Sequence, residues 1–557
     1  MTLPPKRRQP NRRSQAANHG TQHAANRIRT AQRPVRGLDA AMRRSCTYRH
    51  PAGRIVRIET HISVVYLAGR FAYKIIKSVA PGFADFTSAD TRQRCCEAQM
   101  RLNRPLAQGL YLGVLPIVRQ GRLLKLGCSG AAVERAVKMR RFDEAMLFSN
   151  LAMTGALTTR DTDDAAQRLA DCHQRAPRNV PMARYGSAAL LRTQIEAVNA
   201  PLLENFHHPA LHEISAWCMQ QLAKHASAID GRRADGFVRG CHGDLHLDDV
   251  VRWRGGIFMF DCIDFDDALR WIDVASDVAF LVMDLRARAG TRIANRLLNR
   301  WLDISGDYAA LLLTPLYVVY RALVRAWVAC LKGRNASVRR AAAATRDARH
   351  YIDIAWTETQ RPRPILLLCH GFSGSGKSAA SRALAELSGA VRLSTDAERK
   401  RLQSTDEAIT RLGAEHYTRE ARNATYDHLL RLASDVLQTG HCAIIDATFL
   451  EYRHRSAFFA LARRLSVPAH LLDFRAEPSV LAERIEARNR GQRDASDADT
   501  STLTLQLASA DPLTNDERAR AFVFDTAVPL AALDTPAFWR PVLSLMLPSA
   551  ELAAETC

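Results

Sequence analysis

The sequence predicts two domains of different architecture: an N-terminal half with paired strands followed by helices, and a C-terminal α/β half with a parallel sheet. The chain has 557 residues, which is too long for one ordinary domain. In residues 55–80, β-branched and aromatic residues surround an Ala-Gly turn, which is typical of a hairpin. Beyond residue 364, apolar runs alternate with helical segments, which indicates strands buried in a parallel sheet.

The composition favours a soluble, cytoplasmic globular protein. Hydrophobic residues make up 47% and charged residues 24% of the chain, which argues against a disordered class. The longest apolar run, 308–320, is shorter than the about 20 residues that a membrane span needs. Because Arg321 and Arg325 follow it at helical spacing, we expect a buried helix there and no membrane partner. The 12 cysteines lie singly apart from Cys95 and Cys96, which indicates reduced thiols and no zinc site.

The N-terminal segment 1–45 is predicted to be a basic, disordered tail. It contributes to a net charge of +21, lacks apolar periodicity and has Asp39 as the one acidic residue among its first 40. Such a tail can bind nucleic acid or anionic surfaces by counterion release. It also fits an accessory solubilising tail, a misassigned start codon or an organelle transit peptide. We favour the accessory tail over the nucleic-acid tether.

Periodicity predicts the order of elements along the rest of the chain. Helices are expected over 88–107 and 160–235, a strand over 136–142 and a short strand over 256–261. The charged, proline-containing segment TETQRPRP is typical of a linker. The predicted segments are a first domain over 46–357, a linker over 358–364, a second domain over 365–535 and a C-terminal extension over 536–557.

The segment GFSGSGKS matches the phosphate-binding pattern G-x-x-x-x-G-K-[ST], between an apolar run and a helical segment. Its glycines let backbone N–H groups converge on the phosphates of ATP, and the following helix adds a favourable dipole. We expect Lys377 to bridge the β and γ phosphates and Ser378 to hold Mg²⁺. Asp446, which ends a later apolar strand, fits the aspartate that orients hydrated Mg²⁺, although it can instead cap a turn. The predicted loop residues are Gly371, Ser373, Gly374, Ser375, Gly376, Lys377 and Ser378.

Four segments, GFSGSGKS, LSTDAERKRL, IIDATF and ERIEARNRGQRDASDAD, resemble the small P-loop kinases of the polynucleotide-kinase, gluconate-kinase and zeta-toxin group. The resemblance implies that Asp396 is the base for an acceptor hydroxyl and that Arg399 anchors an anionic acceptor. A capping aspartate beside a solvated arginine has the same spacing. The resemblance also implies a lid helix whose arginines neutralise the transferred phosphoryl group. The lid candidates are catalytic Arg488 and nucleotide-binding Arg484 and Arg490, which an exposed helix face would also explain.

The segment HGDLHLDDV resembles the H-G-D-x-x-x-x-N catalytic loop of the aminoglycoside and choline kinase group. The resemblance implies a protein-kinase-like α+β fold of the aminoglycoside phosphotransferase type. It also implies that Asp244 orients the acceptor hydroxyl and that Asp261, after the next strand, binds Mg²⁺. Lys74 corresponds to the lysine that grips ATP phosphates, and Glu97 on the following helix is expected to pair with it. Lys77 competes with Lys74 for this role.

The chain departs from this family pattern at Asp249, where the family carries asparagine. Aspartate offers Mg²⁺ a charged oxygen in place of a neutral carbonyl, so Asp249 remains a metal-ligand candidate. Its charge, and that of Asp248, is expected to repel ATP phosphates unless a second cation binds.

The order of these motifs resembles bacterial bifunctional proteins that join an aminoglycoside-phosphotransferase-like domain to a P-loop kinase domain. The resemblance implies an enzyme with two ATP-dependent, Mg²⁺-dependent phosphotransferase sites that act on an unidentified hydroxyl acceptor. One alternative is a regulatory pseudokinase joined to an active P-loop domain. Another is a nucleic-acid 5′-hydroxyl kinase tethered by the basic tail. The oligomeric state stays open.

Overall fold

The computed structural model describes residues 35–80, 84–178, 180, 182–334, 336–405, 419–491, 500–526 and 528–547. The described chain forms two compact units, of which the first ends at Phe142 and adds residues 263–267. The second unit contains the remaining kinase-like helices and the P-loop region. Most of the predicted basic tail lies outside the described residues.

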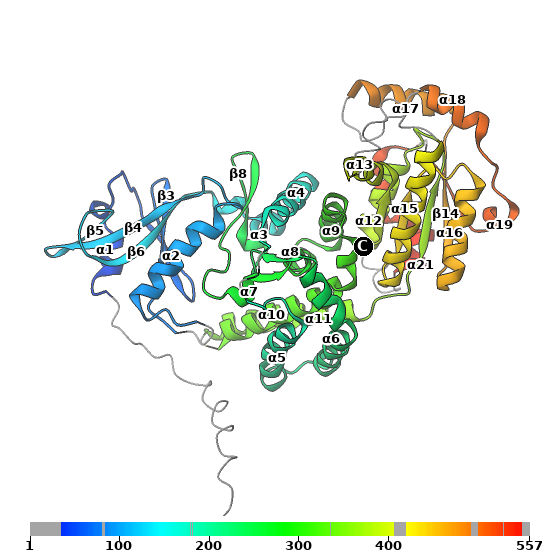
Figure 1. Ribbon diagram of the computed structural model, residues 1–557. Helices are drawn as coiled ribbons and strands as arrows, with labels where there is room; N and C mark the ends of the chain where they lie inside the picture. The colour runs from blue at the N-terminus through cyan, green and yellow to red at the C-terminus, as the bar shows by residue number, and fades with distance from the viewer. Residues whose placement is uncertain are drawn as a thin grey trace, which may run out of the picture. The chain divides into compact units, whose positions relative to one another are not determined.

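The first unit is built on a six-stranded antiparallel sheet in the order β1-β2-β3-β6-β4-β5 (Figure 1). The predicted hairpin is confirmed, since β2 and β3 pair around a turn at Gly69, where φ is 56°. A Cβ on Gly69 would lie 2.5 Å from the Pro51 carbonyl oxygen, so glycine is required. The elements are β1 Val56–Glu59, β2 Ser63–Ala68, β3 Phe71–Ile76, α2 Ala89–Asn103, β4 Tyr111–Gln120, β5 Leu123–Leu126 and β6 Ala132–Arg140.

The predicted tail boundary at residue 45 is wrong, because the fold begins earlier. Helix α1 (Leu38–Met42) ends in a fully buried Met42, and Tyr48 is also buried. Both side chains belong to a hydrophobic cluster with Tyr66 and Tyr73 of the sheet. Their burial provides the apolar contact that a disordered tail lacks.

The kinase-like part of the second unit is mostly helical, with two small antiparallel strand pairs, β7–β10 and β8–β9. The helical stretch predicted over 160–235 consists of three helices. Its elements are α3 Phe148–Met153, α4 Thr159–Arg175, α5 Ala188–Asn205, α6 Leu211–Ala234, β7 Val238–Gly240, β8 Val250–Trp253, β9 Gly256–Met259, α7 Asp267–Arg270, β10 Trp271–Asp273, α8 Val274–Arg288, α9 Thr291–Ser305, the 3₁₀ helix η4 Tyr308–Leu312, α10 Thr314–Gly333 and α11 Val338–Thr359.

The apolar run at 308–320 is buried, as predicted, but it forms two elements. Residues Tyr308–Leu312 are a 3₁₀ helix, and α10 begins at Thr314 with Pro315 in its first turn. Proline is tolerated at this position because the first N–H groups of a helix have no partner within it. Among the described residues, no helix combines the length and the apolar character of a membrane span.

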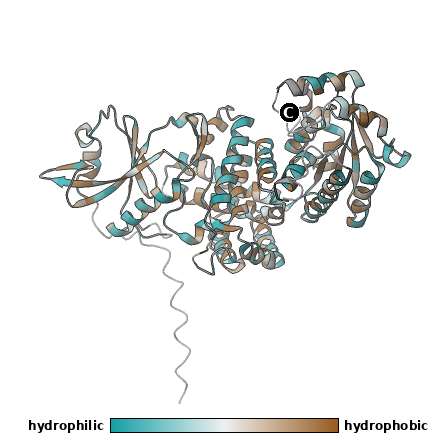
Figure 2. Ribbon diagram, turned by 45° about the horizontal axis from the view of Figure 1, so that its top comes forward, coloured by the Kyte–Doolittle hydropathy of each residue, from teal (hydrophilic) through white to brown (hydrophobic). Residues whose placement is uncertain are grey.

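The P-loop region is a five-stranded parallel sheet in the order β12-β13-β11-β14-β15. Helices α12 and α15 pack against it, and Figure 2 shows hydrophobic residues along its strands. The three predicted strands are confirmed, and β12 and β15 complete the sheet. The elements are β11 Leu366–His370, α12 Lys377–Ser388, β12 Val391–Ser394, α13 Thr395–Thr405, α15 Arg419–Gln438, β13 Ala443–Asp446, α16 Tyr452–Leu465, β14 Ala469–Arg475, α17 Pro478–Gly491, α18 Thr500–Ser509, α19 Asn515–Arg518, β15 Ala521–Asp525, α20 Leu530–Leu533 and α21 Pro536–Met546.

Two further predicted boundaries differ from the structure. The linker predicted from residue 358 begins later, because α11 continues to Thr359 and buries Glu358. The predicted C-terminal extension contains α21, whose Trp539 is fully buried in the same hydrophobic cluster as Leu367 of β11. Helix α21 is therefore part of the P-loop fold.

Candidate active sites

The phosphate-binding loop follows β11 and leads into α12, as the motif requires. Gly374 and Gly376 have φ values of 83° and 82°, which favour glycine. A Cβ on Gly374 would lie 2.6 Å from the Leu481 carbonyl oxygen, and one on Gly371 would lie 2.6 Å from the Phe474 carbonyl oxygen. The loop backbone is thus packed too closely for side chains at these positions. Without side chains at these positions, a phosphate can approach the loop backbone closely.

Lys377, Ser378 and Asp446 come together at the end of the loop. Lys377 is buried, and its Nζ donates to the Phe372 carbonyl oxygen at 2.6 Å and to Ser375 Oγ at 3.3 Å. Asp446 ends β13 with 3% of its surface exposed, and Ser378 hydrogen-bonds its carboxylate. A hydroxyl beside a carboxylate is the oxygen ligand pair that suits Mg²⁺ in P-loop enzymes, so these residues fit the ion.

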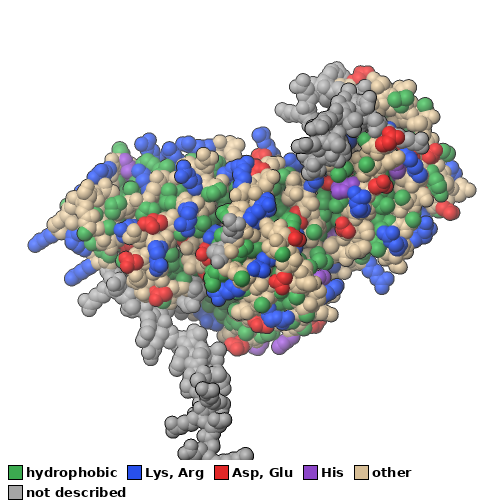
Figure 3. Space-filling view, viewed as in Figure 1, with side chains coloured by type: hydrophobic (Ala, Val, Ile, Leu, Met, Phe, Trp, Pro, Cys, Tyr) green, Lys and Arg blue, Asp and Glu red, His purple; other side chains and the backbone are tan. Residues whose placement is uncertain are grey.

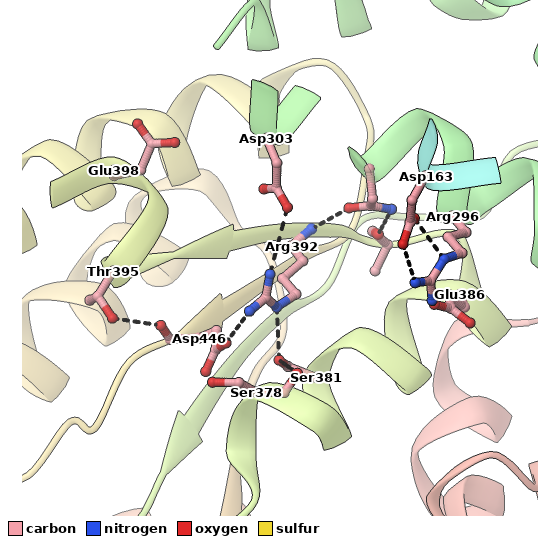
Figure 4. A network of polar contacts seen from close by, with 12 residues as sticks. Asp163, Arg296, Asp303, Ser378, Ser381, Glu386, Arg392, Thr395, Glu398 and Asp446 are labelled. Atoms are coloured by element: carbon pink, nitrogen blue, oxygen red, sulfur yellow. Dashed lines mark hydrogen bonds and ion pairs between the residues drawn. The ribbon is translucent and has the colours of Figure 1, made fainter. Parts of the chain in front are cut away.

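Asp446 is held in its ionised form by neighbouring cations. Burial by itself raises the pKa of its carboxyl, but the charges of Arg392 and Lys377 outweigh burial and keep the pKa below its ordinary value. Arg392 Nη2 donates to Asp446 Oδ2 at 2.5 Å. Its Nε donates to Ser381 Oγ at 3.0 Å (Figure 4). Our sequence reasoning missed Arg392, and the signal available was a charged residue inside a short buried strand.

Helix α13 begins beside Asp446 and brings the acceptor-side candidates together. Thr395 Oγ1 donates to the backbone oxygen of Asp446 at 3.0 Å. One turn of helix then joins Asp396 and Arg399, whose Oδ1 and Nη2 atoms are 3.5 Å apart. Both side chains are partly exposed. Asp396 is therefore accessible to a hydroxyl group, and Arg399 supplies a positive charge next to it.

Arg484 lies against the phosphate-binding loop. Its Nη2 donates to the Thr526 carbonyl oxygen at 2.6 Å, and its Nη1 is 4.0 Å from the position of a Cβ on Gly376. Arg488 and Arg490 lie on the same helix, α17, but their side chains are outside the described residues.

Gln506 of α18 is a second residue that sequence reasoning missed. Its Oε1 accepts from the Ser373 backbone N–H at 2.9 Å, and its Nε2 donates to Ser373 Oγ at 3.0 Å. The side chain thus contacts the phosphate-binding loop directly. No motif marks this glutamine, because its position depends on how α18 packs on the loop.

The kinase-like catalytic loop is held by a buried carboxylate on α8. Asp277 accepts from the backbone N–H groups of His242 at 3.1 Å and Gly243 at 2.9 Å. His173 also hydrogen-bonds Asp277, at 3.2 Å. Burial raises the pKa of Asp277, but the hydrogen bond and charge of His173 outweigh it and lower the pKa to about 2. The ionised carboxylate therefore fixes the backbone conformation that presents Asp244.

Asp244, His246 and Asp249 converge at this loop. One ligand atom from each residue lies within 4.8 Å of the others, a spacing that can hold a metal ion. His246 Nδ1 is 3.3 Å from Asp249 Oδ2, and burial lowers the pKa of His246 although the charge of Asp244 opposes it. The Asp244 side chain is 46% exposed, whereas Asp249 is buried.

Asp261 is connected to the cluster of Asp244, His246 and Asp249 through a backbone hydrogen bond of its neighbour Phe260. The Phe260 backbone N–H donates to the Asp249 backbone oxygen at 2.9 Å, so the residue before Asp261 is joined to Asp249. Asp261 has a φ of 66°, which is rare for a residue with a side chain. Strained backbone of this kind concentrates at functional sites.

Asp248, which is expected to add repulsion at the nucleotide site, is paired with Arg288. Arg288 donates to both carboxylate oxygens of Asp248, at 3.1 and 3.2 Å. Burial raises the pKa of Asp248, but Arg288 outweighs it and lowers the pKa to about 2. The charge of Asp248 is thus offset by a guanidinium, which leaves Asp249 as the unusual charge in the loop.

In the first unit, Lys74 is buried in β3, whereas Lys77 donates to the Thr60 carbonyl oxygen and pairs with Glu59 at 2.6 Å. Lys77 is thereby held at the surface, which favours Lys74 as the phosphate-binding lysine. The predicted pair between Lys74 and Glu97 stays a prediction. Glu97 is exposed on α2 and accepts from Gln93 Nε2 at 2.8 Å.

Two family profiles match the chain in the expected order. Residues 135–313 match the phosphotransferase enzyme family, and residues 366–513 match the AAA domain family. Among solved structures, a gluconokinase from Sinorhizobium meliloti 1021 is 24% identical, with 35% of this chain and 94% of that chain covered and a TM-score of 0.24. Aminoglycoside 2′-phosphotransferase-IIIa is 12% identical, with 57% and 99% covered and a TM-score of 0.36.

The similarity to mycobacterial proteins extends across both domains. A Mycobacterium tuberculosis protein, Rv2004c, is 32% identical over 468 residues, which cover 81% of this chain and 90% of the relative. The Mycobacterium bovis protein Mb2027c matches with the same identity and coverage. In this chain a phosphotransferase-family match precedes an AAA-domain match, and the chain belongs to the same family as these mycobacterial proteins.

Proposed function

We propose that the chain is an ATP- and Mg²⁺-dependent kinase with two sites that transfer the γ-phosphate of ATP to hydroxyl groups. The observation that carries this proposal is the meeting of Lys377, Ser378 and ionised Asp446 at the end of the phosphate-binding loop. Mg²⁺ held by Ser378 and Asp446 would neutralise charge between the β and γ phosphates.

At the P-loop site, the Lys377 ammonium leaves the Phe372 carbonyl oxygen and binds the phosphates of ATP instead. Asp396 accepts the proton of the acceptor hydroxyl as that oxygen bonds to the γ phosphorus. The bond from the γ phosphorus to the bridging oxygen breaks, and ADP leaves with the electron pair. Arg399 supplies positive charge on the acceptor side, and Arg484 supplies it beside the phosphate-binding loop. The transferred group and the acceptor are thereby oriented before reaction.

At the kinase-like site, Asp244 orients the acceptor hydroxyl, while Asp249 and Asp261 are the candidate Mg²⁺ ligands. The exposure of Asp244 and the clustering of His246 and Asp249 support an active site there. The ion pair of Asp248 with Arg288 removes one argument for a pseudokinase, because it leaves less uncompensated charge beside ATP.

The test compares ATP turnover by Lys377→Ala, Asp244→Ala and the double variant, after a screen of hydroxyl acceptors. Two active sites predict partial turnover in each single variant and none in the double variant. If Lys377→Ala removes all turnover, the kinase-like domain is a pseudokinase. Lys400→Ala is the matched control, since Lys400 is exposed on α13. Turnover retained in the double variant would contradict both assignments.

Phosphorylation of nucleic-acid 5′-hydroxyl groups is the less favoured form of this function. Figure 3 shows Lys and Arg side chains mixed with Asp and Glu over the visible face. A protein that binds nucleic acid strongly is instead expected to present a continuous basic surface. The proposed tether falls mainly in residues 1–34, which lie outside the described residues.

A further inference from the structure

One segment of the kinase-like domain, Asp303–Tyr308, contacts the P-loop domain on the side that carries Asp446. The segment joins the end of α9 to η4, and α9 packs against α12 and β12 within the second unit. Figure 4 shows Asp303 pointing toward Arg392, which in turn points toward Asp446. The two domains are thus connected by side chains that end at the candidate Mg²⁺ site.

Arg392 is the centre of this connection. Its Nη1 is 3.7 Å from Asp303 Oδ2, while its Nη2 and Nε bind Asp446 and Ser381. Since Arg392 is buried in β12, its planar guanidinium can satisfy all three partners only in one orientation. The position of the Asp446 carboxylate therefore depends on Arg392, and the orientation of Arg392 depends on Asp303.

Asp303 also affects the charge around the candidate Mg²⁺ site. Arg392 stabilises ionised Asp446, but it also places a full positive charge beside the place where Mg²⁺ would bind. Asp303 offsets part of that charge from the far side of the guanidinium. Its Oδ1 atom is buried and has no hydrogen-bond partner among the described residues. Burial raises the pKa of the Asp303 carboxyl, and the charge of Arg392 opposes this more than the charges of Arg300 and Arg382 do.

The same segment also fixes α13, the helix of Asp396 and Arg399. Arg401 Nη2 donates to the Asp303 backbone oxygen at 2.8 Å, and Tyr308 Oη donates to Glu398 Oε1 at 3.0 Å. A Cβ on Gly306 would overlap the Arg401 guanidinium, at 1.6 Å. The kinase-like segment is therefore packed against the acceptor side as well as the metal side.

We infer that Asp303 of the kinase-like domain is a positioning residue of the P-loop kinase site, acting through Arg392 on Asp446. This inference rests on the proposed function, because it requires Asp446 to act toward Mg²⁺. The kinase-like domain then completes the P-loop site whether or not it transfers phosphate itself. Its contribution is to set how much Mg²⁺ the P-loop site needs.

The test is the Mg²⁺ dependence of binding of a fluorescent ADP analogue by the full chain, in a Lys74→Ala background that removes the phosphate-binding lysine of the kinase-like site. We expect Asp303→Asn to raise the half-saturating Mg²⁺ concentration by about tenfold, the usual scale for residues behind a metal ligand. Binding in EDTA is expected to be unchanged. Asp303→Glu, which keeps the charge, is expected to retain most of the wild-type Mg²⁺ affinity.

The matched control is Arg296→Gln at the same domain contact. Arg296 pairs with Asp163 at 2.6 Å and also contacts Glu386, but it does not touch Arg392. Its replacement is expected to lower the melting temperature and leave the Mg²⁺ requirement unchanged. An equal shift in this variant, or no shift in Asp303→Asn, would overturn the inference.

Two further measurements separate the possible failures. If Asp303→Asn melts below the assay temperature, Arg392→Lys replaces it, and it is expected to raise the Mg²⁺ requirement because lysine cannot bridge three partners. An unchanged requirement in that variant overturns the inference. If the Lys74→Ala background binds no nucleotide, or Lys377→Ala does not weaken its binding, the proposed P-loop function fails instead.

Discussion

At the scale of single residues, the buried charges are the informative features of this molecule. Asp277 and Asp446 are both ionised in the interior because each has cationic or N–H partners that outweigh burial. Motif spacing identified Asp446 and Asp244 in the sequence, because family patterns fix those positions. It did not identify Arg392 or Gln506, since their roles arise only when separate elements pack against the phosphate-binding loop.

Asp249 stands where the family pattern has asparagine, and its contribution to the kinase-like site is measurable. In a Lys377→Ala background, we expect Asp249→Ala to raise the Mg²⁺ concentration needed for turnover by at least about tenfold, because it removes a charged metal ligand. Asp249→Asn is expected to retain turnover, since the amide oxygen still ligates the ion. Steady-state turnover across a Mg²⁺ series checks both variants. Unchanged Mg²⁺ dependence in Asp249→Ala would show that Asp249 is no ligand.

Asp277 predicts a specific acid sensitivity. Its pKa of about 2 lies below the ordinary value of 3.8, so its stabilising effect is complete above about pH 4 and is lost as the pH falls through about 2. We expect Asp277→Asn to cost about 1–3 kcal/mol at pH 7, because an amide leaves one loop N–H unpaired. Its free energy of unfolding should also fall less steeply than that of the wild type between pH 4 and 2.

Urea unfolding over this pH range, with exposed Asp235→Asn as the control, tests the prediction. Parallel wild-type and Asp277→Asn curves would contradict it.

At the scale of elements, strong periodicity was sufficient to predict the main strands and helices. The hairpin β2–β3, the strand β11 and helix α12 follow from local pattern and turn chemistry. Strand β12 was not predicted because it has four residues and contains Arg392. Helix α21 was assigned to an extension because nothing local indicates that its apolar face packs on a distant sheet.

Helix α21 supplies an element-scale prediction. Trp539 is fully buried, contacts Phe474 and Phe524, and donates from Nε1 to the Leu533 carbonyl oxygen at 2.8 Å. We expect Trp539→Ala to destabilise the P-loop domain by about 3–5 kcal/mol, because it leaves a large cavity. Leu545→Ala on the same helix is the control, since Leu545 is 44% exposed. Chemical denaturation measures both, and equal small effects would contradict the burial of α21.

At the scale of the whole molecule, the charge of +21 raises the question of what the tail does. We expect deletion of residues 1–34 to leave small-molecule phosphorylation unchanged and to weaken retention on a polyanionic column, because only positive charge is lost. Turnover and salt-dependent retention of the two chains measure these effects. A deletion that selectively removes phosphorylation of a 5′-hydroxyl oligonucleotide would instead establish the tail as a nucleic-acid tether.

The contact between the kinase-like and P-loop domains predicts how the second unit unfolds. Strand β12 is at the edge of the parallel sheet, where its backbone groups would lack a strand partner. Asn299 of α9 takes that place: its Nδ2 donates to the Ala390 carbonyl oxygen at 3.0 Å, and its Oδ1 accepts from the Arg392 N–H at 2.9 Å. A side chain of one domain thus completes the sheet of the other.

We therefore expect the two domains of the second unit to unfold together, and Asn299→Ala to weaken that coupling. The variant leaves the Arg392 N–H of β12 and the Ala390 carbonyl oxygen just before this strand unpaired, which costs about 1–3 kcal/mol. Calorimetry should show a lower melting temperature for the P-loop domain and a broader or divided transition. Arg300→Ala, at the adjacent exposed position of α9, should leave the transition unchanged. An unaltered transition in Asn299→Ala would mean that the two domains are stabilised independently. Water would then hydrogen-bond the backbone groups that Asn299 contacts in the wild type.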